Sequence, residues 1–239
     1  MENNIIIETL YPEFANLFGD LMNTGYLKKC IPDAVFTDTH LFDEPAFVSQ
    51  DVSMVFMGAM SEKQQELVVS ALTPHKERII ELIDKGCIFL MTGNAMEIFG
   101  QYIENEDNSR FKCLGLFDTY AKRYMFNRHN SYILGEFEGM KLLGFKSQFS
   151  HSYGDNSDCY FYKVTKGCGI NPESDLEGIR RNHFYGTYTI GPFLISNPPF
   201  VKYLLSIMGI EHPELAFEDT IMSAYNSRLL QFENFKPSH

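Results

Sequence analysis

Short apolar runs alternate with helix-like segments through the first hundred residues, and this alternation restricts the fold more than any other feature of the sequence. We expect strands at residues 5–10, 34–38, 52–57 and 87–91. The third is almost entirely apolar, which is typical of a parallel strand covered by helices on both faces. Alternating strands and helices in this order predict a doubly wound parallel sheet.

The segments between these strands are expected to be helical, at residues 14–29, 62–85 and 95–102. Pro74 should divide the second segment, because proline suits the first turn of a helix and not its interior. Thr73 is the expected cap of the new helix, and Glu77 would complete a capping box. Gly86 is expected to end it.

The pattern changes at about residue 110, where turn-rich and strand-like segments become frequent. We expect strands at 132–137, 142–149 and 160–164, and helices at 199–208 and 214–230. The second half should therefore add antiparallel strands on one side of the parallel sheet. A length of 239 residues suits a single α/β domain over residues 1–239.

The chain is acidic, with a formal net charge of -11 and no run of Lys or Arg. Such a charge argues against nucleic acid and anionic membranes as partners. Five cysteines without a CxxC pair fit a reducing compartment. No signal-peptide core and no apolar stretch of roughly 20 residues is present, so we expect a cytoplasmic protein. No metal-ligand spacing is found, and we expect neither a metal nor a cofactor.

Two turns follow the central strands of the predicted sheet, at Gly58-Ala59-Met60 and at Thr92-Gly93-Asn94. Ligands of open parallel sheets bind at the carboxyl ends of the strands, where both turns should lie. Small residues around one central side chain are typical of a nucleophile elbow. Backbone N–H groups of the two turns would then converge on one oxyanion.

Motifs between about residues 5 and 209 carry a more specific signal. In the first hundred residues, three segments match family motifs: residues 16–20 with Asn23 match N-L-Y-x-D-x-G-N, residues 55–65 match V-F-I-G-G-G-x-D-R-E-Q, and residues 92–100 fall on C-G-G-Y-Q-x-L-G. Further on, residues 114–118 match G-L-G-L-L-D, and Asn127-Arg128 fall on an Asn-Arg pair. Gly144-Phe145 match the start of G-F-E-N-H, and residues 177–192 match E-G…G-T-Y-L-H-G-P. In these motifs the chain resembles class I glutamine amidotransferase domains of the cobyric-acid-synthase type. It is most similar to the glutaminase subunits of lipid II isoglutaminyl synthase.

This resemblance implies a flavodoxin-like fold and, in active relatives, release of ammonia from glutamine for a partner ligase. The family's nucleophilic cysteine falls on Thr92, and its histidine base falls on Ile190. A hydroxyl is far less acidic than a thiol, and isoleucine cannot transfer a proton. The resemblance therefore implies a pseudoenzyme without glutaminase activity.

The turns themselves are expected to keep a binding role, because backbone N–H donors do not depend on the side chains. The expected binding residues are Gly58, Ala59, Gly93, Asn94 and Arg128. The sequence leaves open whether this pocket is open or filled by Met60, Met96 and Ile190.

Other side chains are weaker candidates. Cys87 is expected to be a buried core residue, whereas the segment of Cys168 resembles a G-x-G-N-N loop of the family, which implies a place near the pocket side. His183 is expected to be a structural histidine, and His151 lies in a predicted loop that would reach the pocket only if it folds inward. Arg128 either binds a carboxylate or forms a surface ion pair.

Three functions remain open at this stage. The first is a non-catalytic binding module that contacts a Mur-ligase-like protein or a second copy of the chain, linked to amidation of peptidoglycan precursors. The second is an enzyme of altered hydrolase or amidase chemistry in the same pocket. The third is an unrelated flavodoxin-like ligand-binding protein. A nucleophile within hydrogen-bond reach of a base would favour the second.

Overall fold

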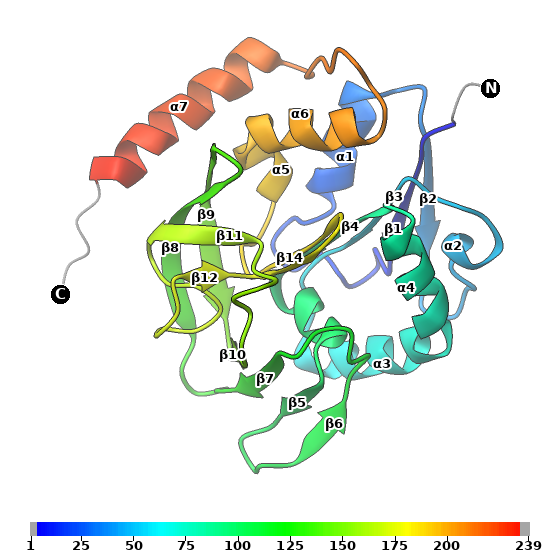
Figure 1. The fold of residues 1–239 in the computed structure, drawn as a ribbon, viewed down its shortest axis with the longest axis vertical. Coiled ribbons are helices and arrows are strands. Elements are labelled where there is room, and N and C mark those ends of the chain that lie inside the picture. The colour runs from blue at the N-terminus through cyan, green and yellow to red at the C-terminus, as the bar shows by residue number, and fades with distance from the viewer. Residues whose placement is uncertain (1–3, 235–239) are drawn as a thin grey trace.

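A computed structural model describes residues 4–234, and its largest element is a six-stranded sheet in the order β13-β14-β4-β3-β1-β2 (Figure 1). Five of the strands run parallel, and β13 at the edge is antiparallel to β14. The strands are β1 (Ile6–Leu10), β2 (Val35–Thr39), β3 (Met54–Met57), β4 (Ile88–Thr92), β13 (Ile179–Arg181) and β14 (Phe184–Thr187). The predicted parallel α/β sheet is confirmed.

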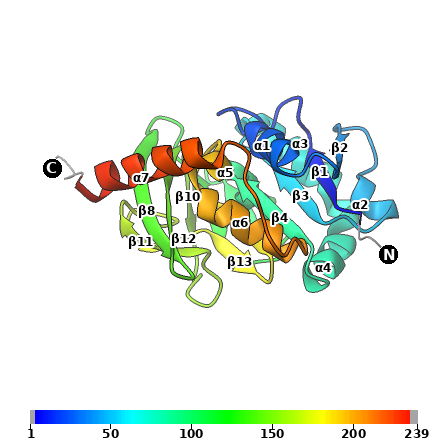
Figure 2. The same ribbon diagram turned by 90° about the horizontal axis from the view of Figure 1, so that it is seen from above.

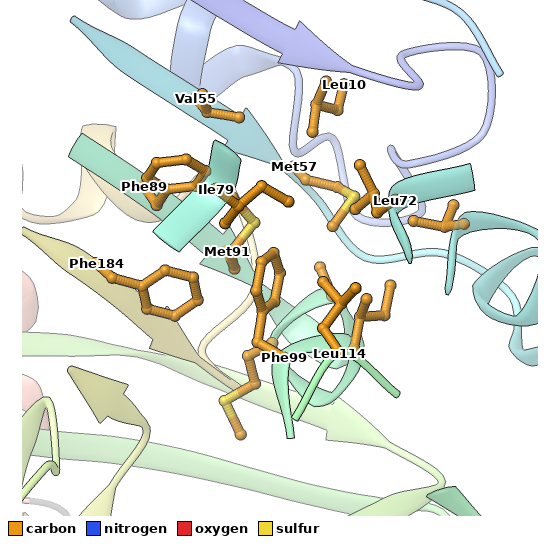
Figure 3. Packing of buried hydrophobic residues seen from close by; sticks show 14 of the residues in the cluster. Leu10, Val55, Met57, Leu72, Ile79, Phe89, Met91, Phe99, Leu114 and Phe184 are labelled. Carbon is orange, nitrogen blue, oxygen red and sulfur yellow. The ribbon is translucent and has the colours of Figure 1, made fainter. Parts of the chain in front are cut away.

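Helices cover both faces of this sheet because the central strands are apolar on both sides (Figure 2). Phe89 and Met91 of β4 pack with the helices α3 and α4, as Figure 3 shows. Their neighbours Ile88 and Leu90 belong to the core under α1, α5 and α6. The helices are α1 (Met22–Cys30), α2 (Ala46–Ser49), α3 (Glu62–Leu72), α4 (Lys76–Asp84), α5 (Phe193–Ser196) and α6 (Pro198–Ile207), with 3-10 helices η1 (Thr73–His75) and η2 (Gly93–Phe99).

The second half adds antiparallel strands, as predicted, and they form two four-stranded sheets in which most pairings are antiparallel (Figure 1). One has the order β10-β7-β5-β6 and the other β12-β11-β8-β9. Their strands are β5 (Tyr102–Glu104), β6 (Arg110–Lys112), β7 (Tyr120–Arg123), β8 (His129–Phe137), β9 (Met140–Gln148), β10 (Ser150–Tyr153), β11 (Tyr162–Lys166) and β12 (Leu176–Glu177). Helix α7 (Glu218–Asn234) packs on the β8–β9 hairpin through Tyr225.

The first helix begins at Met22, eight residues later than predicted. The residues before it form a series of turns in which two backbone N–H groups bond to side chains and not to helical carbonyls. Asp20 accepts the N–H of Phe18, and Asn16 accepts the N–H of Leu21. Asn and Asp compete with the helix for backbone partners in this way. The apolar pattern alone did not reveal this competition.

Two further predictions about local structure are wrong. Thr73 does not cap α4; its hydroxyl donates to the carbonyl of Val69 at 2.6 Å, and a capping box forms instead between Ser61 and Gln64 at the start of α3. The helix predicted at residues 95–102 is too long, because the 3-10 helix η2 ends at Phe99 and the chain then enters β5. None of the helices within residues 4–234 has the length and hydrophobicity of a bilayer span.

Candidate functional site

A shallow cleft of about 100 Å³ lies beside the turns that follow β3 and β4, and we call it the elbow cleft. Four of the predicted binding residues line it: Ala59, Gly93, Asn94 and Arg128. The predicted base position, Ile190, lines it as well. Pockets for small ligands usually enclose roughly 300–1,000 Å³, so the elbow cleft is small for a substrate site.

Thr92, the predicted nucleophile position, is fully buried at the end of β4 and is not among the described residues that line the cleft. Its backbone is extended, with φ -104° and ψ 148°. The hydroxyl donates a hydrogen bond of 2.9 Å to Oδ1 of Asp20. The hydroxyl of Thr92 therefore binds a buried carboxyl group and does not face the cleft as an attacking group.

The sharp bend of the chain falls one residue later, at Gly93, whose φ is +63°. A Cβ atom at this position would lie 2.6 Å from Cβ of Ala59 and 3.4 Å from Cγ2 of Ile190. Only glycine fits, because the methyl group of Ala59 already fills the space of a side chain at position 93. Ile190 closes the same space from the opposite turn.

The backbone donors of the β3 turn already have partners. The N–H of Ala59 bonds to the carboxylate of Asp20. The N–H of Met60 donates to Oδ1 of Asn94 at 3.0 Å, and Nδ2 of Asn94 donates back to the carbonyl of Met60 at 2.8 Å. On the β3 side, the anion-binding nest that the sequence predicted is thus occupied by side chains of the protein itself.

Asp20 holds the two turns together from beneath the cleft, where it is fully buried. Burial raises the pKa of its carboxyl group, against the hydrogen bonds from Phe18 and Thr92. A Cβ atom at Gly58 would lie 2.4 Å from Cβ of Asp20, so Gly58 is a packing residue under the cleft and not a binding residue in it. Asp20 belongs to the motif at residues 16–20, but the motif alone does not reveal this role.

A second buried carboxylate, Glu97 in η2, lies in a hydrogen-bonded network near the elbow cleft. It accepts bonds from the hydroxyls of Ser150 and Tyr188 and from Nε2 of Gln65, the last at 2.7 Å. Gln65 also donates to the carbonyl of Asn94, so the network supports the β4 turn. Burial raises the pKa of Glu97. The apolar pattern of residues 95–102 gave no sign of this polar network.

Arg128 is exposed at the rim of the elbow cleft. Its guanidinium lies 4.8 Å from the ring centroid of Phe149, a cation–π distance. No ion pair of Arg128 is found within residues 4–234. The guanidinium therefore faces the cleft without a carboxylate of the described chain to neutralise it.

The structure brings two of the weaker candidates together. Sγ of Cys168 lies 3.4 Å from Nε2 of His129, a residue that the sequence analysis did not single out. The ring of His151 packs against His129, with centroids 5.1 Å apart. His151 is on β10 and not in a loop, and burial lowers its pKa to about 4. No sequence spacing links these positions, because they meet only through the pairing of distant strands.

The other two candidates are structural. Nδ1 of His183 lies 3.0 Å from the carbonyl oxygen of Gly86. Cys87 is buried before β4, and burial raises the pKa of its thiol to about 12. Within the described part of the chain, no group of three or more His, Cys, Asp or Glu side chains is arranged to hold a metal.

A second, larger cleft lies away from the elbow and encloses about 930 Å³ between the β8–β9 turn, β13 and the loop before β11. Its charged lining residues are Asp118, Glu136, Glu138, Asp155, Asp158, Arg180 and Arg181. Both arginines are paired with carboxylates, Arg180 with Glu138 and Arg181 with Asp84. This cleft is therefore acidic, in contrast to the rim of the elbow cleft at Arg128.

Comparisons with known proteins agree with the fold and with the motifs. No protein-family model matches the chain. It is 28% identical over 169 residues to the lipid II isoglutaminyl synthase (glutamine-hydrolyzing) subunit GatD of Staphylococcus aureus (strain N315), covering 70% of this chain and 68% of that protein. It is 24% identical over 200 residues to the same subunit of Streptococcus pneumoniae (strain ATCC BAA-255 / R6), covering 77% and 75%.

Solved structures with a similar fold include PurLQS from Thermotoga maritima, with a TM-score of 0.54 and coverage of 95% of this chain and 99% of that chain. A glutamine amidotransferase from the same organism has a TM-score of 0.53 and coverage of 94% and 93%. Both are 11% identical in sequence, so they bear on the fold alone.

Proposed function

We propose that this class I glutamine amidotransferase-like chain, related to the GatD subunit of lipid II isoglutaminyl synthase, does not hydrolyse glutamine and instead binds a partner protein. One observation carries the proposal. The space for a side chain on the elbow turn is filled by Ala59 and bounded by Ile190, while the turn itself is Gly93. An attacking atom and its base have no place in such a cleft.

The position of the family's nucleophile is better assigned to Gly93 than to Thr92. A nucleophile elbow puts the attacking residue on the sharp, strained turn between strand and helix. Here the positive φ is at Gly93, whereas Thr92 is extended. A gapless match of residues 93–100 to C-G-G-Y-Q-x-L-G also places the cysteine at position 93. Ile190 then lies next to it, where a base would stand.

Amide hydrolysis by a thiol needs a nucleophile, a base and donors for the oxyanion. Glycine at position 93 offers no side chain, and Ile190 cannot accept a proton. The N–H of Met60 is already bonded to Asn94. Residues of one catalytic unit depend on one another, so these changes together are expected to lower the rate of glutamine hydrolysis by several orders of magnitude.

The hydroxyl of Thr92, next to the turn, does not support an altered reaction in the same cleft. Thr92 is buried and bonded to Asp20, whose own pKa is raised by burial. A hydroxyl that is buried and bonded beneath the cleft is not placed to attack a ligand inside it. We therefore place the chain's role in binding and not in a changed reaction of the elbow.

The proposed partner is a Mur-ligase-like protein, with a second copy of this chain as the alternative, in the amidation of a cell-wall precursor. The relatives are named as subunits, which supports a role within an assembly. The exposed Arg128 at the rim of the elbow cleft is a candidate contact for a partner carboxylate.

Two measurements test this proposal. Titration calorimetry with glutamine is expected to give no saturable heat up to about 10 mM, a range that covers weak ligands. Saturable binding of glutamine would contradict a closed elbow cleft. Co-expression with the Mur-ligase-like protein of the same genome should give a stable complex on size exclusion, weakened by Arg128→Ala. A chain that elutes alone as a monomer would contradict the partner role.

A further inference from the structure

We propose that Cys168 and His129 form a base-assisted thiol site that reacts with small uncharged electrophiles, next to the elbow cleft, which Gln148 also lines. Sγ of Cys168 and Nε2 of His129 are 3.4 Å apart, within hydrogen-bond reach for sulfur. Both side chains are half-buried, so a small molecule can reach them while bulk water is partly excluded. A thiol within reach of an imidazole is the basic arrangement of a nucleophile and its base.

The surrounding fold fixes the position of the thiol. Lys146 on β9 is fully buried and donates to the carbonyl of Cys168 at 3.0 Å and to that of Gly169 at 2.5 Å. The same ammonium pairs with Glu177 on β12 at 2.5 Å. The loop that carries Cys168 is thus tied to two strands, whereas His129 is set by its pairing with Gln148. The contact between thiol and imidazole is therefore built by rigid elements and not by two mobile side chains.

Two polar atoms next to the pair have no hydrogen-bond partner in the described structure. They are Oε1 of Gln148, a residue with 7% of its surface exposed, and Nδ1 of His151, whose ring packs against His129. Buried polar atoms are nearly always bonded, so two unpaired atoms in one cluster indicate a place for a polar guest. Both residues adjoin His129, the proposed base, through strand pairing and ring packing, and this distinguishes the cluster from a cysteine packed only for its volume.

The chemistry of the pair follows from its surroundings. Burial, together with the nearby Lys146, lowers the pKa of His129, so its imidazole is neutral at pH 7 and can accept a proton. Burial raises the pKa of the Cys168 thiol, against the opposing effect of Lys146. Few thiolates exist at rest, and reaction needs the proton to leave as the sulfur attacks. With an alkyl halide, the S–C bond forms, the carbon–halogen bond breaks, halide leaves, and the thiol proton passes to Nε2 of His129.

The chain contains its own comparison for this reactivity. Cys159 is also half-buried, but its charged neighbours are the carboxylates of Asp118, Asp155 and Asp158, which together with burial raise the pKa of its thiol. No histidine bond to Cys159 is found in residues 4–234. Both thiols are half-buried, and only Cys168 has an adjacent imidazole in the described structure, so Cys159 is the matched control for Cys168.

The test is the rate of alkylation of each cysteine by iodoacetamide at pH 7.5, followed by peptide mass spectrometry on the folded protein. A positioned base contributes roughly 100-fold or more in full catalytic geometry, so Cys168 should react at least about 10-fold faster than Cys159. His129→Gln should remove that advantage and leave the Cys159 rate unchanged. Asn130→Ala, at the exposed neighbouring position of β8, should leave both rates unchanged.

Equal rates at Cys168 and Cys159 in the natural chain would overturn the proposal. A Cys168 rate that survives His129→Gln would do the same, since the imidazole would then be a packing contact only. An unchanged Cys159 rate and an unchanged unfolding midpoint of His129→Gln would show that the variant is folded, so that a slower Cys168 reaction reflects the lost imidazole.

Discussion

A methyl group on Ala59 occupies the volume that any side chain on Gly93 would need, since the two Cβ positions would be 2.6 Å apart. Real Cβ atoms do not approach this closely, so a residue other than glycine at position 93 requires glycine at position 59. Removing the Ala59 methyl leaves its Cα at 3.3 Å, a tight but tolerable contact. At the scale of single residues, the proposed loss of a nucleophile at position 93 and the closing of the cleft are therefore one coupled change.

His151 leads to a prediction about pH at the same scale. Its pKa is about 4 in the folded chain against an ordinary value of 6.5, because of burial and of the nearby His129 and Lys146. Between these values the unfolded chain binds more protons, so the free energy of unfolding falls as the pH drops from 6.5 towards 4. His151→Gln should flatten this fall in thermal-melt series from pH 7 to pH 4.5. The same slope in the variant would show that His151 titrates normally, and exposed His212→Gln is the control.

At the scale of elements, the sequence predicted the parts that apolar patterns determine. The strands β1, β3 and β4 and the helix α6 lie where their apolar residues predicted them, because each buries a continuous face. The pattern failed where polar side chains decide the backbone. Asp20 and Asn16 delay α1, and Glu97 sits in a 3-10 turn that apolar spacing mistook for a helix. The meeting of Cys168 with His129 depends on strand pairing across 39 residues, which no local pattern contains.

The true cap of α3 gives a prediction at this scale. Ser61 accepts the N–H of Gln64, whose side chain bonds back to the N–H of Ser61. Ser61→Ala should lower the free energy of unfolding by about 1 kcal/mol in urea denaturation. Thr73→Ala, at the position where the sequence predicted a cap, should cost less, because its hydroxyl donates to Val69 within the helix. An equal or larger loss at Thr73 would contradict this assignment.

At the scale of the whole molecule, a buried ion pair joins the added strands to the parallel sheet. Lys146 on β9 pairs with Glu177 on β12, and Glu177 also accepts from the hydroxyl of Thr187 and the N–H of Tyr188 after β14. Both charged side chains are almost completely buried. Such a link supports the inference that residues 1–239 fold as one domain.

Lys146→Met tests that link, because it leaves the carboxylate of Glu177 buried without its cation. Breaking a buried pair from one side costs about 3–5 kcal/mol, and we expect a loss of this size in the free energy of unfolding. The denaturation curve should keep one transition. Lys141→Met removes an exposed pair with Glu233 and should leave the midpoint nearly unchanged. Two separate transitions in either protein would contradict a single folding unit.

The central claim, a closed and inactive elbow, is tested most directly by ammonia release from glutamine. The natural chain is compared with Ala59→Gly/Gly93→Cys/Ile190→His, which restores thiol, base and space, and with Thr92→Cys/Ile190→His. We expect no release by the natural chain, slow release by the triple variant, and none by the Thr92 variant, whose thiol would face Asp20. Turnover by the natural chain would contradict the loss of function, and activity in the Thr92 variant alone would contradict the assignment of Gly93.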